Sequence, residues 1–166
     1  MRYVCSCCGG GQRGVMDLVK NLPDTLFALP DEERQARAIV TDDLCSLDDE
    51  NFFVRAILPV PIIGTKDVFA FGVWGSVSQE NFKTYATEFE NPAPAFGPFF
   101  SWLNSALGPY PNTFNLKSSL VFQPNNQRPV MRLDPSEHPL ALEQRTGITI
   151  DKLSEIYAAW GHEIVL

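Results

Sequence analysis

Long apolar runs are missing from this sequence of 166 residues. No stretch approaches the ~20 uninterrupted apolar residues that span a membrane. Residues 1–11 also lack the apolar core of a secretory signal. Three of the four cysteines crowd into residues 5–8, where neighbouring thiols cannot pair without severe strain, which favours a reducing compartment. We therefore expect a cytoplasmic protein with no membrane contact.

Positive charge is also scarce. Lys and Arg number 13 against 20 Asp and Glu, and the formal net charge is −7 at pH 7. Because such a surface repels phosphate backbones, nucleic acid is not an expected partner. The chain has no Walker loop, no Gly-x-Gly-x-x-Gly after a strand and no Gly-x-Ser-x-Gly elbow, which excludes the commonest nucleotide-binding and acyl-transfer enzymes.

The apolar runs that are present predict a mixed fold. Strands are expected at residues 44–47, 52–60, 68–77, 114–122 and 129–133, with the first two and the last two joined as hairpins. The two glycines within 68–77 indicate a bulge or a close backbone approach. Helices are expected at residues 30–40, 78–89, 138–145 and 151–160. We predict an α+β fold with a single, largely antiparallel sheet of about five strands and helices packed on one face.

Two segments of this one domain, residues 1–166, do not follow a regular pattern. Residues 1–14 are rich in cysteine and glycine and are expected to form a turn. Residues 91–113 combine prolines with aromatic side chains that a disordered linker would not carry. We interpret the second segment as a packed irregular excursion, with one helical turn around residues 101–107.

The N-terminal turn contains a half zinc site. Cys5 and Cys8, followed by Gly9, have the Cys-x2-Cys-Gly spacing with which a zinc knuckle offers two thiolates to one metal. Two further ligands would have to come from elsewhere in the chain. The alternative is a set of free thiols at a turn.

One basic and one imidazole side chain stand at positions that suggest a site. Arg55 lies inside an apolar strand, so its guanidinium must reach water or a carboxylate, for which Asp42 and Asp43 are candidates. A solvent-facing arginine is the alternative. His138 stands where the last strand gives way to a helix, which suits a general base but also an ordinary residue of a first helical turn.

Aromatic residues supply a further set of candidates. Trp74, Trp102 and Tyr110 are either core residues or part of a concave binding patch with Lys117 and Arg128 at its rim. Side chains of this kind dominate both cores and binding surfaces, so the two uses remain open.

The order of several motifs resembles one bacterial family. The motifs are Cys5-x2-Cys8-Gly9, Phe52-Phe53-Val54-Arg55, Gly72-Val73-Trp74, Tyr110-Pro111-Asn112-Thr113, Leu116-Lys117, Arg128-Pro129, His138-Pro139-Leu140-Ala141 and Gly147-Ile148-Thr149. Together they are similar to the family catalogued as domain of unknown function 2199 over nearly the whole chain. The resemblance implies a bacterial cytosolic protein and brings no activity with it. Relatives often carry a histidine shortly after the knuckle glycine, which this chain lacks, and this weakens the zinc hypothesis.

Three functions are compatible with these patterns. The leading hypothesis is a non-catalytic protein-binding domain of the inhibitor or immunity type, whose partner has a basic surface. The second is a small zinc-binding protein that uses Cys5 and Cys8. The third is an enzyme with a cleft formed by Arg55, Lys117 and His138. Oligomeric state is left open by the sequence.

Overall fold

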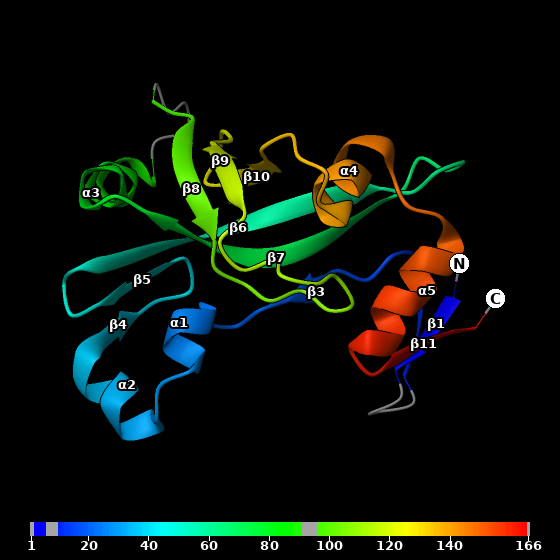
Figure 1. Ribbon diagram of the computed structural model, residues 1–166, viewed down its shortest axis with the longest axis horizontal. Coiled ribbons are helices and arrows are strands. Elements are labelled where there is room, and N and C mark those ends of the chain that lie inside the picture. Colours follow the sequence, from blue (N-terminus) through cyan, green and yellow to red (C-terminus); the bar gives the residue numbers. More distant parts are fainter. Residues whose placement is uncertain (1, 6–9, 91–95, 166) are drawn as a thin grey trace.

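The computed structural model describes residues 2–5, 10–90 and 96–165 of the chain (Figure 1). Within these residues the main sheet has the strand order β3-β7-β8-β9-β10-β6-β5-β4, and a second sheet has the order β11-β1-β2. The strands are β1 (Arg2–Cys5), β2 (Gly11–Arg13), β3 (Leu18–Val19), β4 (Ala38–Val40), β5 (Leu44–Leu47), β6 (Asn51–Pro61), β7 (Val68–Val77), β8 (Phe99–Leu103), β9 (Lys117–Val121), β10 (Val130–Leu133) and β11 (His162–Val165). The helices are α1 (Asp24–Phe27), α2 (Asp31–Arg37), α3 (Gln79–Glu88), α4 (Pro139–Thr146) and α5 (Ile150–Ala159). The predicted α+β class is confirmed.

Five strands of the main sheet close into a barrel. β6 pairs antiparallel with β7 along its length, and β7, β8, β9 and β10 follow as antiparallel neighbours. β10 then returns to β6 through a parallel pairing of Val130 with Ile57, and the Ile57 amide donates to the Pro129 carbonyl at 2.9 Å. The finer prediction, a single sheet of about five strands with helices on one face, is therefore wrong. β6 pairs with β7 on one side and with β10 on the other, and this closes the five strands into a ring.

The barrel interior is filled by alternate side chains of its strands. Val54, Ala56 and Leu58 of β6 are fully buried. At Gly75 of β7, an added Cβ would lie 3.0 Å from Met131 Cε and well inside contact distance of Ser101 Oγ. Glycine at position 75 therefore leaves room for side chains of the neighbouring strands inside the barrel.

β5 and β4 extend the main sheet beyond β6. β5 and β6 form the predicted hairpin, in which Leu44 opposes Val54, and β4 pairs with β5 as an end strand. Helix α1 covers one side of this extension (Figure 1). A second, smaller core forms there from Leu26, Cys45, Leu47, Phe53 and Trp74. This core joins the extension to the outside of the barrel.

Helix α2 ends earlier than expected. The prediction ran to Val40, whereas Ala38 is already extended, with φ −111° and ψ 142°, and Ala38–Val40 is strand β4. The β-branched residues Ile39 and Val40 favour a strand, and pairing with β5 overrides the helical propensity of the preceding turn.

Helices α4 and α5 cover the main core beside the small sheet (Figure 1). Gln144 of α4 is buried, accepts from the Leu133 amide at 2.8 Å and donates to the Met131 carbonyl at 2.8 Å. α5 buries Leu153, Ile156 and Tyr157. The predicted helices at 78–89, 138–145 and 151–160 agree with α3, α4 and α5 to within about two residues.

Two segments differ from the sequence-based expectation. Residues 99–103 form strand β8 between β7 and β9, where an irregular excursion with a helical turn was expected. Its side chains alternate between buried and exposed, as in a half-buried strand. Residues 91–95 of that excursion lie outside the described residues. At the N-terminus, β1 and β2 pair where a turn was expected, and residues 6–9 between them lie outside the described part. None of the described helices has the length and apolar content needed to cross a membrane.

Candidate functional site

Nearly all the net charge of the chain lies in one short segment. Residues 31–50, which form α2, β4, β5 and their turns, contain eight carboxylates and two arginines, a net charge of −6 out of −7. We call residues 31–50 the acidic hairpin. Its carboxylates are Asp31, Glu32, Glu33, Asp42, Asp43, Asp48, Asp49 and Glu50. The negative field of the protein is therefore centred on this extension of the sheet.

Part of this charge is compensated internally. Arg37 pairs with Asp48 at 2.7 Å and with Glu33 at 2.9 Å, and Arg34 pairs with Asp31. The hydrogen bond from Arg37 holds the pKa of the Asp48 carboxyl below its usual value. The carboxylates of Glu32, Asp42, Asp49 and Glu50 have no ion pair within the described residues and are exposed. They remain available to a partner.

An apolar groove lies between the acidic hairpin and α3. It consists of two adjoining pockets of about 280 and 310 Å³ that share Thr41 and Leu44 in their walls. We call these two pockets the hairpin groove. Its apolar lining residues are Ile39, Leu44, Phe52, Phe82 and Phe89, and the carboxyl-bearing residues Asp42, Asp43 and Asp49 line the same pockets. Lys83 of α3 lines the first pocket as well, so the groove combines an apolar floor with three carboxyl-bearing residues and one ammonium.

The end strand β4 exposes both side chains and backbone beside this groove. Ile39 is 72% exposed and Val40 is 45% exposed. The Thr41 amide donates to the Leu44 carbonyl and the Asp48 amide donates to the Arg37 carbonyl. Since hydrogen-bonded positions alternate along an antiparallel ladder, Ile39 bonds toward β5 and the backbone groups of Val40 point away from the sheet. This edge can accept a further extended segment.

Arg55 connects the acidic hairpin to the barrel. One guanidinium nitrogen donates to the Asp42 carbonyl at 3.0 Å and another to the Lys20 carbonyl at 3.2 Å. The guanidinium lies 5.3 Å from the ring centroid of Trp74, whose indole N–H also donates to the Lys20 carbonyl, at 3.0 Å. The predicted partner Asp42 therefore contributes its backbone carbonyl to the Arg55 guanidinium. Burial lowers the pKa of Arg55, and repulsion from Arg128 adds to this effect.

Arg128 forms the second connection. Its Nε lies 2.6 Å from the Asp43 carboxylate, in the turn between β4 and β5. The Tyr85 hydroxyl of α3 is buried without a hydrogen-bond partner in the described part of the chain. Burial, reinforced by Asp43, raises the pKa of that hydroxyl. Arg55 and Arg128 thus contact the 41–43 turn at two points, beside the hairpin groove.

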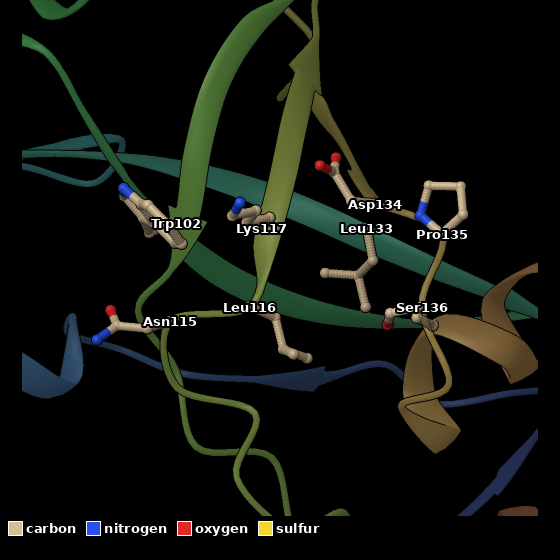
Figure 2. A pocket seen from close by; sticks show the side chains of 9 residues that line it. Trp102, Asn115, Leu116, Lys117, Leu133, Asp134, Pro135 and Ser136 are labelled. Carbon is tan, nitrogen blue, oxygen red and sulfur yellow. The ribbon is translucent and has the colours of Figure 1, made fainter.

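Trp102 and Lys117 lie together elsewhere, on the outer face of β8 and β9. They oppose each other in the ladder, and the Lys117 ammonium lies 5.8 Å from the Trp102 ring centroid. Both line a pocket of about 450 Å³ (Figure 2). Trp102 is 38% exposed, whereas Trp74 is fully buried. Of the two tryptophans predicted for a site or the core, Trp74 is in the core and Trp102 is at the surface.

Tyr110 and His138 stabilise the start of α4. The buried Tyr110 hydroxyl donates to the Glu143 carboxylate, and burial raises the pKa of that hydroxyl. His138 caps α4: its Nδ1 accepts from the Leu140 amide at 3.1 Å, and its Nε2 lies 2.6 Å from the Pro111 carbonyl. Both ring nitrogens are thus in use. The interpretation of His138 as a residue of a first helical turn agrees with this geometry.

The predicted site residues therefore fall into three separate places. Arg55, Trp74 and Arg128 lie at the base of the acidic hairpin, Trp102 and Lys117 on the outer face of the barrel, and Tyr110 and His138 at the start of α4. Of the three side chains predicted to form an enzyme cleft, only Lys117 lines one of the pockets described above.

The described residues give the zinc hypothesis no support. Cys8 lies outside them, and only the backbone of Cys5 is described, in β1. Cys45 is buried in the second core. No group of three His, Cys, Asp or Glu side chains that could hold a metal ion occurs within the described residues.

The sequence matches one family of bacterial proteins over most of its length. A family model described as "Uncharacterized protein conserved in bacteria (DUF2199)" matches residues 4–148. The chain belongs to this bacterial family. The predicted resemblance is confirmed, and the match includes the barrel, the acidic hairpin and α4 of this DUF2199 protein. No curated protein and no solved structure matches the chain.

Sequence reasoning did not identify the residues that line the hairpin groove. Ile39 falls within the helix predicted at residues 30–40, and Asp42 and Asp43 are considered as partners of Arg55. The net charge of residues 31–50, taken separately from the rest of the chain, is the signal that could have identified the segment.

Proposed function

We propose that this DUF2199 protein is a non-catalytic, protein-binding domain of the bacterial cytosol that holds a basic partner protein in the hairpin groove, in the manner of an inhibitor or immunity protein. The observation that carries the proposal is an apolar floor lined by Asp42, Asp43 and Asp49, within a segment of net charge −6. Apolar contact supplies affinity at such a surface, and the surrounding carboxylates accelerate encounter with a basic partner and exclude acidic ones.

The two contacts that hold the 41–43 turn support the same function. Arg55 and Arg128 fix the 41–43 turn to the barrel, so the groove exists before a partner arrives. A preformed surface loses little conformational freedom on association, which leaves more of the contact free energy for binding. The exposed edge of β4 adds backbone hydrogen-bonding capacity beside the groove.

The charge of the hairpin favours a foreign partner over a second copy. Pairing two β4 edges would bring two segments of charge −6 together. Charges of one sign on an edge strand oppose such self-association. The occupant expected here is therefore a different protein with a basic contact surface.

The test uses wild type, a hairpin variant and a control variant as baits to capture a partner protein from a lysate of the native host. The captured partner is then identified and purified. The hairpin variant carries Glu32→Lys, Asp42→Lys and Glu50→Lys. The control variant carries Asp67→Lys, Glu137→Lys and Glu163→Lys, which changes the net charge equally at exposed positions outside residues 31–50. Circular dichroism and thermal melting establish that all three forms are folded.

We expect wild type and the control variant to bind one basic protein in a one-to-one complex, and the hairpin variant to bind it at least about tenfold more weakly by calorimetry. Ile39→Lys, which changes the apolar floor at a position 72% exposed, is expected to weaken binding similarly. An equal loss of affinity in the hairpin and control variants would show that only the net charge of the protein matters for binding, and the proposal would fail. Recovery of no one-to-one partner, or of an acidic one, would also overturn it.

A further inference from the structure

Three side chains stand in a row across the outer face of β8, β9 and β10. Trp102 opposes Lys117 in the β8–β9 ladder. The Asp134 amide donates to the Lys117 carbonyl at 2.9 Å, so Asp134 opposes Lys117 on the other side. Side chains at such opposing positions have Cβ atoms about 4.5–5.5 Å apart and can interact directly. The row therefore places an indole, an ammonium and a carboxylate side by side on the barrel.

The row forms the upper rim of the pocket of about 450 Å³ in Figure 2. The floor is apolar and comes from Leu116, Leu133 and Ala141, of which Leu133 is 7% and Ala141 2% exposed. These residues belong to the end of β10, the start of α4 and the turn before β9, all of which pack on the main core. A small molecule could therefore place an apolar group on a firm surface beneath the row.

The opposite charges of the rim do not satisfy each other. Lys117 and Asp134 form no ion pair within the part of the chain that the structure describes, although they are cross-strand neighbours. Figure 2 shows the Lys117 ammonium turned toward Trp102, with the Asp134 carboxylate on its other side. One positively and one negatively charged residue thus line the same pocket without pairing with each other.

We propose that this pocket binds a small zwitterion with an apolar body, of the kind represented by an aromatic amino acid. The ligand carboxylate pairs with the Lys117 ammonium, and the ligand ammonium pairs with the Asp134 carboxylate. The apolar group lies on Leu133 and Leu116 against the Trp102 indole. A ligand with a single charge would satisfy one rim group and face repulsion from the other. The pocket is therefore selective for the presence of both charges.

The probe is L-phenylalanine, with phenethylamine and 3-phenylpropionate as matched compounds that lack the carboxylate and the ammonium, respectively. Binding is measured by calorimetry on the full chain and by the indole N–H signal of Trp102 in nitrogen-15 correlation spectra, assigned by its disappearance in Trp102→Phe. We expect phenylalanine to bind with a Kd on the order of 0.1–1 mM, in the range for a ligand of this size in an open pocket. Each single-charge compound is expected to bind at least about tenfold more weakly.

Variants of the two rim charges distinguish this recognition from apolar binding alone. In Lys117→Met, phenylalanine and phenethylamine are expected to bind alike, because the partner of the carboxylate is removed. In Asp134→Asn, phenylalanine and 3-phenylpropionate are expected to bind alike. Arg132→Met, an exposed residue of β10 that does not line the pocket, leaves all three affinities unchanged.

Three outcomes would overturn the proposal. The first is no saturable heat and no shift of the Trp102 signal up to about 10 mM phenylalanine. The second is equal binding of phenylalanine and the two single-charge compounds by wild type. The third is unchanged discrimination in Lys117→Met and Asp134→Asn. The hairpin variant described above leaves this pocket intact, so failure here and failure of the proposed partner binding are independent.

Discussion

Replacing Gly75 by alanine tests the packing inside the barrel. Gly75 lies inside the barrel, where an added Cβ would be 3.0 Å from Met131 Cε, 3.4 Å from Leu120 Cδ2 and closer still to Ser101 Oγ. The three neighbours come from β10, β9 and β8, and contact with Met131 requires the sheet to curl until β10 faces β7, as it does in the barrel. Overpacking of this kind costs typically about 1–3 kcal/mol of unfolding free energy. We expect a value of about 2–3 kcal/mol, because Ser101 is fully buried and has little room to move.

A second substitution separates this clash from a general effect of alanine in a strand. The Ser101 hydroxyl oxygen is buried without a hydrogen-bond partner among the described residues. Ser101→Ala should therefore be neutral or stabilising by up to about 1 kcal/mol, since it removes an unsatisfied polar group. In the double variant the closest clashing atom is absent, and the methyl end of Met131 can rotate away. We expect the double variant to recover more than half of the loss caused by Gly75→Ala.

Urea denaturation followed by circular dichroism measures all four forms of this cycle. With a urea dependence of about 2 kcal/mol/M, a loss of about 2 kcal/mol lowers the midpoint by about 1 M. The coupling free energy between positions 75 and 101 is expected to exceed about 1 kcal/mol. The reasoning is refuted if Gly75→Ala lies within about 0.5 kcal/mol of wild type, or if its cost is the same with serine and with alanine at position 101.

Three further predictions concern single side chains. Burial raises the pKa of the Cys45 thiol to about 12, so its thiolate fraction in the folded protein at pH 8 is on the order of 10⁻⁴. Iodoacetamide should therefore label Cys45 at least about 100-fold more slowly in native protein than in urea, as measured by peptide mass spectrometry. Equal labelling rates would contradict the burial of Cys45. Arg55→Met removes two hydrogen bonds and the contact with Trp74, and should cost about 2 kcal/mol of unfolding free energy in urea denaturation. Arg55→Lys should recover less than half of this loss, because one ammonium cannot reach both carbonyls. Full recovery in Arg55→Lys would be inconsistent with the two hydrogen bonds described. Tyr110→Phe removes the hydrogen bond to Glu143 and should cost about 1 kcal/mol of unfolding free energy at neutral pH. Because the pKa of Tyr110 is raised in the folded protein, the stability that its hydroxyl contributes is present below about pH 10 and is lost above it, so the variant should lose less stability than wild type between about pH 10 and 12. An identical dependence of stability on alkaline pH in the two proteins would argue against this hydrogen bond.

Local patterns in the sequence predict most of the helices and strands, but not the way the sheet closes. Ser78, as a helix N-cap, places the start of α3 correctly, and its side chain accepts from the Asn81 amide at 3.2 Å. The β5–β6 hairpin and β7 follow from apolar runs and turn residues. Closure depends on β8, whose short run Phe99–Leu103 is flanked by prolines and glycines. That composition obscures the strand pattern and led us to predict an irregular segment.

The candidate site likewise has features that the sequence predicts and features that depend on the tertiary structure. The expectation that Arg55 requires a nearby acceptor follows from the cost of burying an unpaired guanidinium, and the structure supplies two carbonyls. Which acceptor is used could not be predicted, because Lys20 reaches Arg55 only through the packing of β3 on β7. The hairpin groove could not be predicted either, since it lies between the hairpin and α3. Sequence separation gives no measure of such distances.

Strand β6 has three neighbours along its length, namely β5, β7 and β10. The acidic hairpin can therefore detach from β6 while the barrel stays closed, whereas the barrel cannot open without disturbing the strand to which the hairpin is attached. Amide protons of β4 and β5 should then exchange with solvent through local opening, and those of β6 and β7 through global unfolding. A partner in the hairpin groove would slow exchange in the hairpin first, which would map the contact by mass spectrometry without any substitution.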